Sequence, residues 1–206
     1  MDMDALHLTG WLLVGGSVLF WIGAGNPYLI RAWMAPHADY LAIVARRPGA
    51  WRFTSLFLMT GTVVTAAGFA GLPALLPDGW GRALAAGAVG AFEIAATLWI
   101  ISLLYRHAVL PTMARTFVET GVVDAGSAPL DRLSGGLFQG FMVIGFAAIA
   151  AIGVAATAGG PIAPMVGWGS AVLSALLVAA LVAFGDVPPL TIYIPTLALG
   201  VALLTA

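Results

Sequence analysis

The sequence contains no cysteine and no lysine, and charged residues of any kind make up only 8% of it. Without cysteine, this chain cannot form disulfides, thiolate metal centres or a cysteine nucleophile. A water-soluble domain usually carries about 25% charged residues, so this composition cannot cover a surface that faces water. The hydrophobic fraction is instead 61%, and most of the chain is expected to lie in lipid. The net charge of −1 makes nucleic acid an unsuitable partner.

Six long apolar stretches predict an all-α polytopic membrane protein with a single domain over residues 1–206. The expected spans are about 8–25, 53–76, 82–105, 133–157, 165–184 and 189–206. Each has close to the ~20 residues that a helix needs to cross a bilayer. Two longer connections, 26–52 and 106–132, are too polar to cross and predict short helices at the membrane interface. Pro195 is expected to kink the last span.

The arginines are distributed very unevenly between the two ends of these spans. Seven of the eight lie in or at the edge of the two long connections, namely Arg31, Arg46, Arg47, Arg52, Arg106, Arg115 and Arg132. Connections that are rich in arginine stay on the cytoplasmic side during insertion. The sequence therefore predicts that the two long connections lie inside and that both termini lie on the non-cytoplasmic side.

Small residues that recur along one face of a helix mark where membrane helices approach one another closely. Such stripes are Thr54, Gly61, Thr65 and Gly68 on the second span, Ala83, Gly87, Ala91 and Ala95 on the third, and Gly167, Ala171, Ala175, Ala179 and Ala183 on the fifth. We expect these faces to pack within one bundle. In the alternative interpretation, the face of the fifth span joins two copies of the chain as a homodimer.

Glu93 is the one charged residue that falls in the middle of a predicted span. It lies 11 residues after Arg82 and 13 before Arg106, which places it roughly 16–20 Å along the helix from either end. A carboxylate at that depth costs at least ~2.5 kcal/mol, so such residues usually face the bundle interior or a water-filled cavity. Because the small-residue stripe on the opposite side should also pack, we expect this span to be a central helix.

Several polar residues at similar depth are candidates for a ligand or proton site together with Glu93. They are Thr97, Ser17, Thr62, Thr65 and Ser174, with Gln139 nearer the cytoplasmic side. The alternative is that Glu93 is a buried hydrogen-bonding residue that fixes how the helices pack.

No motif for catalysis or for phosphate binding is present, which favours a non-enzymatic role. Histidines His7, His37 and His107 lie outside the middle of the spans, so neither a haem nor a metal ion is predicted. Most tryptophans fall near span ends and are expected to anchor the chain at the interface. Trp21 and Trp99 lie deeper and are expected to pack in the bundle or to line a pocket.

The C-terminal half carries the segments Leu133-Ser134-Gly135-Gly136-Leu137 and Pro164-Met165-Val166-Gly167-Trp168 ahead of an apolar run. In these segments it resembles small multi-pass membrane proteins of bacterial genomes that are grouped as domains of unknown function. The resemblance implies a six-helix protein of the bacterial inner membrane. It implies no functional residues.

Three functions fit these observations. The leading interpretation is a non-enzymatic integral membrane protein that binds or passes a small hydrophobic or weakly polar molecule, or an accessory subunit of a larger membrane complex. The second is a proton-coupled transporter that uses Glu93. The third is a haem-bearing or enzymatic membrane subunit, for which the sequence offers neither ligands nor a nucleophile. No cofactor is predicted, and membrane lipid is the expected surrounding.

Overall fold

The computed structural model describes residues 3–122 and 126–206, and over these residues the chain is built from helices without a β-strand. The elements are α1 (Met3–Ala24), α2 (Pro27–Met34), α3 (His37–Arg46), α4 (Pro48–Leu75), α5 (Trp80–Ala108), α6 (Leu110–Thr120), α7 (Ser127–Ala156), α8 (Pro164–Phe184), the 3-10 helix η1 (Pro189–Ile192) and α9 (Tyr193–Leu204). Five helices, α1, α4, α5, α7 and α8, are long and apolar enough to cross a membrane.

These five long helices overlap the first five predicted spans, and their ends differ from the predicted ends by up to six residues. The prediction of short helices in the two polar connections is confirmed, because α2, α3 and α6 occupy them. The sixth predicted span corresponds to η1 and α9, residues 189–204, which are apolar but shorter than the five long helices. Pro195 does not kink a helix, because it lies in the first turn of α9, where a missing N–H breaks no intrahelical hydrogen bond.

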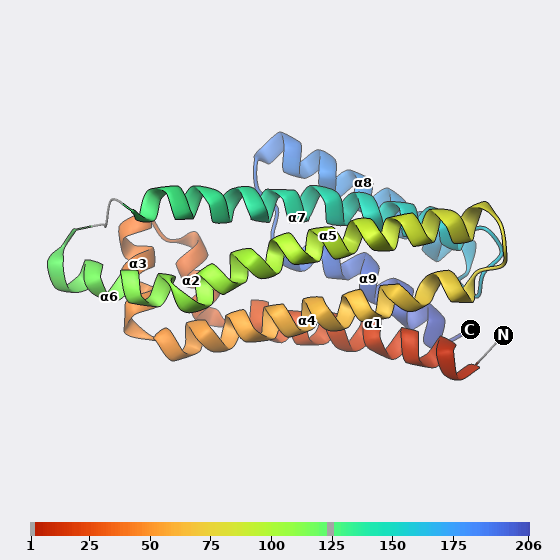
Figure 1. Cartoon of the computed structure of the whole chain (residues 1–206), viewed down its shortest axis with the longest axis horizontal. Coiled ribbons are helices and arrows are strands. Elements are labelled where there is room, and N and C mark those ends of the chain that lie inside the picture. Colours follow the sequence, from red (N-terminus) through yellow and green to blue (C-terminus); the bar gives the residue numbers. More distant parts are fainter. Residues whose placement is uncertain (1–2, 123–125) are drawn as a thin grey trace.

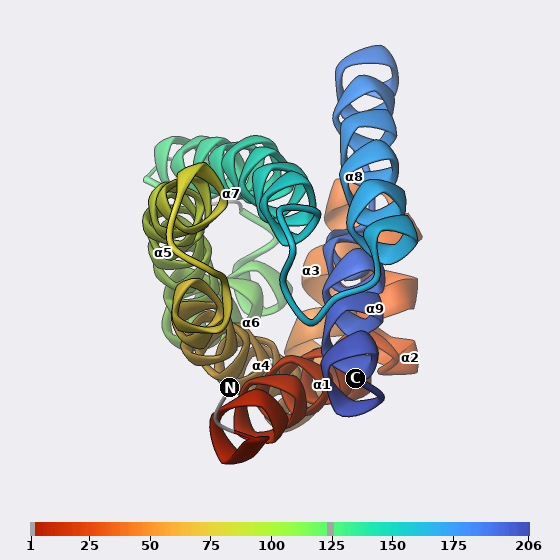
Figure 2. The same ribbon diagram turned by 90° about the vertical axis from the view of Figure 1, so that its right-hand side faces the viewer.

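Four of the long helices and the shorter α9 form a ring around one core rather than a layer around a central helix. Seen end-on, α1, α4, α5, α7 and α9 enclose the core, and α8 stands outside against α7 (Figure 2). The expectation that the Glu93 span would be central is therefore wrong, because α5 is one wall of the ring.

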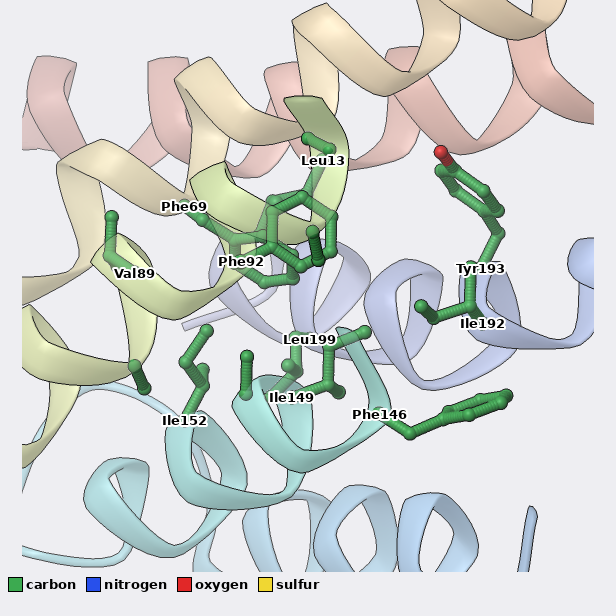
Figure 3. Packing of buried hydrophobic residues seen from close by; sticks show 14 of the residues in the cluster. Leu13, Phe69, Val89, Phe92, Phe146, Ile149, Ile152, Ile192, Tyr193 and Leu199 are labelled. Atoms are coloured by element: carbon green, nitrogen blue, oxygen red, sulfur yellow. The ribbon is translucent and has the colours of Figure 1, made fainter. Parts of the chain in front are cut away.

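Apolar side chains from all five ring helices fill the space between them. Leu13, Phe69, Phe92, Ile149 and Leu199 each come from a different helix and are almost fully buried. Figure 3 shows these side chains converging from opposite walls. The core therefore ties together helices that are far apart in the sequence, and it is lined by aromatic and branched aliphatic groups.

The contact between α1 and α4 is unusually close because glycines from both helices meet there. A Cβ atom on Gly61 would lie only 2.7 Å from the backbone nitrogen of Phe20, and one on Gly68 would lie 2.8 Å from Leu13. The prediction that the stripe on the second span packs within the bundle is confirmed.

The two ends of the bundle differ in charge. Helices α2, α3 and α6 gather at one end, whereas the start of α1 and the end of α9 lie at the other (Figure 1). Seven of the eight arginines lie on or beside the elements of the first end, which we call the arginine-rich end. The eighth, Arg82, lies at the opposite end in an ion pair with Asp78.

Candidate functional site

A cavity of about 570 Å³ opens at the arginine-rich end of the bundle. It lies between the short helices α2 and α3 and the ends of α4, α5, α7 and the segment 185–190. Its volume is within the ~300–1,000 Å³ that is usual for small-molecule sites. We call it the aromatic cavity, because the rings of Trp33, Tyr40, Trp51, Trp99 and Phe138 line it.

The aromatic walls are held in place by ring contacts. Trp99 stacks on Phe141 with ring centres 5.2 Å apart, and it also touches Phe138 at 5.5 Å. Tyr40 meets Trp51 edge-on at 5.7 Å. These contacts join α3 to α4 and α5 to α7, so the walls are rigid surfaces supplied by four different helices.

Two indole groups are also fixed by hydrogen bonds. Trp51 Nε1 donates to the backbone oxygen of Arg106 at 2.8 Å, which closes the side of the cavity between α4 and α5. Trp33 Nε1 donates to Asp186 Oδ2 at 3.3 Å near the exposed mouth. The first bond ties α4 to α5, and the second ties α2 to the loop after α8 with the carboxylate of Asp186 at the rim.

Two donor groups that line the cavity have no acceptor among the described residues. The indole Nε1 of Trp99 is buried and has no hydrogen-bond partner. The guanidinium of Arg106 lies over the Trp99 ring, with Cζ 5.6 Å from its centre. Among the described residues nothing forms a hydrogen bond or an ion pair with that guanidinium. An unsatisfied buried donor is costly, so the buried Trp99 indole favours a bound acceptor, and the half-buried Arg106 guanidinium offers a charged donor beside it.

Next to Arg106 lies a small cluster of phenols and one carboxylate. The Tyr105 hydroxyl donates to Asp131 Oδ1 at 2.6 Å. Burial raises the pKa of Tyr40 to about 12, although the positive charge of Arg106 acts in the opposite direction and Asp131 adds to the rise. Tyr40 is therefore a neutral phenol at physiological pH, and Asp131 is already engaged with Tyr105. Among the described residues, no hydrogen bond or ion pair links the Arg106 guanidinium to this cluster.

The groups that line the cavity indicate the kind of ligand that it suits. Flat apolar walls favour a planar ring or a branched hydrocarbon body. The free donors of Trp99 and Arg106 favour an oxygen acceptor on the ligand, and a guanidinium binds a carboxylate or phosphate most strongly. The site therefore suits an amphipathic molecule whose acidic or carbonyl group reaches Arg106.

The residues that the sequence placed in one polar pocket are distributed over several parts of the structure. Ser17 and Thr62 are buried near the contact of α1 and α4, and each donates to the carbonyl four residues earlier, at 2.8 Å. Thr62 also contacts the Tyr193 hydroxyl at 2.9 Å. Thr65 is buried beside Gly16, and over the part of the chain that the structure describes its hydroxyl has no hydrogen-bond partner. These three positions share the interior of the bundle, and none of them lines the aromatic cavity.

Glu93 and Thr97 lie on the outer side of α5, and both are exposed. The Thr97 hydroxyl donates to the backbone oxygen of Glu93 at 2.9 Å and not to its carboxyl. The expectation that Glu93 faces the bundle interior is wrong. The register of α5 explains this, because large apolar residues such as Phe92 and Trp99 take the inward positions.

Gln139 and Ser174 lie apart from the other predicted site residues. Gln139 is exposed and lines the aromatic cavity, so it is the one predicted residue that belongs to this site. Ser174 is buried on α8 without a hydrogen-bond partner. The structure therefore does not bring the seven predicted residues together.

Sequence reasoning missed Arg106, Tyr40 and Asp186 as members of a binding site. Arg106 was assigned only to membrane orientation, although Trp99 was expected to pack or to line a pocket. The signal that could have found the site is the density of tryptophan and tyrosine close to arginine at one end. The position of the segment 185–190 beside α2 could not be found from local patterns, because it depends on the path of α8.

Over the part of the chain that the structure describes, no group of three or more side chains is placed to hold a metal ion. Comparison with models of protein families, with curated proteins and with solved structures finds no match to this chain. The resemblance of the C-terminal half to small bacterial membrane proteins stays a prediction.

Proposed function

We propose that this chain is a non-enzymatic integral membrane protein that binds a small amphipathic molecule in the aromatic cavity. The ligand has a flat or branched apolar body and an acidic or carbonyl oxygen. The single observation that carries the proposal is the Arg106 guanidinium, which lies in this cavity over the Trp99 ring without a hydrogen-bond or ion-pair partner among the described residues.

The position of the cavity supports a ligand that comes from the membrane or its surface. The mouth carries the exposed side chains of Ile30, Trp33 and Asp186, whereas Leu58 and Trp99 deeper in the cavity are buried. An apolar body can enter between exposed apolar groups while its polar end reaches Arg106. A role as a carrier, a sensor or an accessory subunit of a larger complex would use the same binding step.

The proposal includes a location and an orientation. We infer six crossings in a bacterial inner membrane, with 189–204 as the sixth, since this apolar stretch packs along α1 as one wall of the ring. The arginine-rich end then faces the cytoplasm. The aromatic cavity would thus open at the cytoplasmic interface, where tryptophan and tyrosine are enriched.

The transporter interpretation receives less support. A proton carrier must face a water-filled path, and Glu93 is on the outer side of α5. It does not line the aromatic cavity. We therefore do not place a transport step at Glu93.

Binding can be tested with 2-naphthoate, which is a planar aromatic carboxylate, by calorimetric titration of the protein in lipid nanodiscs. We expect binding to the unmodified chain and a loss of at least about tenfold in affinity for Arg106→Met, because a charge-assisted hydrogen bond is removed. Naphthalene-2-methanol, which has no acidic group, should bind the unmodified chain and Arg106→Met equally weakly.

Arg115→Met is the matched control, because Arg115 is an exposed arginine at the same end but does not line the cavity. It should leave the affinity for 2-naphthoate unchanged. Equal losses in Arg106→Met and Arg115→Met would mean that only the general positive charge attracts the probe, and the proposed site would be rejected.

A further inference from the structure

The carboxyl of Glu93 lies in an energetically unfavourable place for a single copy of this chain. Glu93 is 13 residues after Trp80 and 15 before Ala108, the two ends of α5, so about 20 Å of helix separates it from each end. Its side chain is exposed and has no hydrogen-bond or ion-pair partner among the described residues. A carboxyl that faces hydrocarbon at this depth is strongly disfavoured and normally has a partner.

The surface around Glu93 is not covered by any other part of the described chain. Small or short side chains flank it, and we call this strip the Glu93 face: Ala86, Gly90, Glu93 and Thr97. A Cβ atom on Gly87 or Gly90 would meet no atom within 4 Å. In Figure 2 the side of α5 away from the core is free. Another helix could therefore approach α5 closely at Gly90.

The side chain needs a partner that both donates and accepts. The Thr97 hydroxyl is already directed at the backbone oxygen of Glu93. A neutral carboxyl carries one O–H donor and retains acceptor oxygens. Two such groups can therefore satisfy each other reciprocally, so that Glu93 is complementary to a second Glu93.

A second copy of this chain provides that group at the correct depth. Two copies insert with the same orientation because they carry the same arginines. A two-fold axis along the membrane normal then brings equal residues to equal depth on the two copies. The eight arginines lie near helix ends or on the short helices, so no arginine of this chain could be the partner at this depth.

We propose that the Glu93 face is the contact surface of a symmetric dimer, in which the two Glu93 carboxyls pair between neighbouring α5 helices. Gly90 lies one turn away and allows the backbones to approach. The contact is separate from the aromatic cavity, because none of the residues of the Glu93 face lines it. Dimer formation and ligand binding can therefore be tested independently.

The dimer can be measured by single-molecule photobleaching of the fluorescently labelled chain in liposomes over a range of protein-to-lipid ratios. We expect a monomer–dimer equilibrium whose Kd rises at least about tenfold in Gly90→Leu and about tenfold in Glu93→Leu. Glu93→Gln should stay within about threefold of the unmodified chain, because an amide also donates and accepts. Gly169→Leu is the matched control, since Gly169 is an exposed helical glycine on α8 with nothing within 4 Å of its Cβ position.

A second measurement does not depend on the stability of the leucine variants. The chain has no cysteine of its own, so Gly90→Cys gives one thiol on the Glu93 face. Oxidation in native membranes should cross-link two copies through this thiol, because a disulfide needs Cα atoms within about 7 Å. Gly169→Cys should not cross-link.

Three outcomes would overturn the proposal. One is a chain that stays monomeric at every lipid dilution, which would mean that Glu93 meets a different protein or lipid. Another is a dimer that is unaffected by Gly90→Leu and does not cross-link through Gly90→Cys. The third is a dimer that is lost in Ala179→Leu and kept in Gly90→Leu, which would place the contact on α8.

Discussion

Hydroxyl side chains inside the ring are satisfied mainly by their own helices. Ser17, Thr62 and Thr196 each donate to the carbonyl four residues earlier, at 2.8 to 2.9 Å. In lipid this local bond spares the side chain from needing a partner on another helix. Thr62 also contacts Tyr193 from α9. Because the single proton of Thr62 is directed at its own helix, we assign the Tyr193 hydroxyl as the donor between them.

The first prediction concerns the unequal effect of removing the two members of this pair. Tyr193→Phe removes the donor and leaves Thr62 satisfied, so it should lower the free energy of unfolding by about 0.5–1 kcal/mol. Thr62→Val leaves a buried Tyr193 hydroxyl without an acceptor, so it should cost about 1–3 kcal/mol. The measurement is equilibrium unfolding in mixed micelles, and Thr60→Val on the exposed side of α4 should change little.

The double variant Thr62→Val, Tyr193→Phe decides whether the hydrogen bond is the cause. With both polar groups removed, the unfolding free energy should recover relative to Thr62→Val alone. Strict additivity of the two single effects would show that the residues act separately, and the assignment of Tyr193 as donor would then be wrong.

The sequence identified the polar residues of the spans but not how they are satisfied. Thr62 and Ser17 looked like members of a midplane pocket because their depth is similar to that of Glu93. The depth of a residue in the membrane follows from its position along a span. The direction of its side chain depends instead on which face of the helix is turned toward the core. On α5 that choice is made by the bulk of Phe92 and Trp99, and it turns Glu93 outward.

At the scale of the element, a glycine is needed for packing where two helix backbones meet, and it is not needed where its Cβ position faces open space. Gly61 on α4 lies against α1, and a Cβ there would be 2.7 Å from Phe20 N and 2.8 Å from Gly16 O. Both neighbours are backbone atoms and cannot rotate away. Gly15 lies on the same helix as Gly16, but its Cβ position has nothing within 4 Å.

The second prediction is a difference in sign between two glycine-to-alanine substitutions. Gly61→Ala should lower the free energy of unfolding by about 1–3 kcal/mol, because α1 and α4 must separate. Gly15→Ala should raise it by about 0.5–1 kcal/mol, because alanine favours the helix and meets no obstacle. The same unfolding assay measures both, and a stabilised Gly61→Ala variant would contradict the close contact.

Small-residue stripes predicted packing correctly for one helix and poorly for another. On α4 the stripe contains Gly61 and Gly68, and both are buried against α1. On α5 the expected stripe leaves Ala83 and Gly87 exposed, because alanine occurs on every face of that helix. A stripe is therefore informative where its residues differ from the rest of the helix and uninformative where the whole helix is small.

At the scale of the whole molecule, the ring of helices and α8 differ in how much of their surface is buried. Buried side chains fill most of the ring interior, whereas α8 stands outside and has the smallest buried share of the five long helices (Figure 1). Its first half is fixed to α7, where a Cβ on Gly167 would lie 2.6 Å from the oxygen of Gly153. Its second half exposes Ala175, Ala179 and Ala183. The loop that follows α8 thereby reaches α2 and completes the mouth of the aromatic cavity.

The charge asymmetry of the molecule gives the third prediction, which tests the orientation and the sixth crossing together. Thr116 on α6 and Pro188 before η1 are exposed at the end with the aromatic cavity, and Thr205 is exposed beyond α9 at the other end. The chain has no cysteine, so Thr116→Cys, Pro188→Cys and Thr205→Cys each carry a single thiol. A maleimide that cannot cross membranes should label Thr205→Cys in intact cells, and it should label the other two variants only after the membrane is opened.

Labelling of Pro188→Cys and Thr205→Cys from the same side would show that 189–204 returns without crossing. Labelling of Thr116→Cys in intact cells would reverse the orientation. That result would require seven arginines to lie on the side from which they are normally excluded during insertion, and it would move the aromatic cavity to the outer surface.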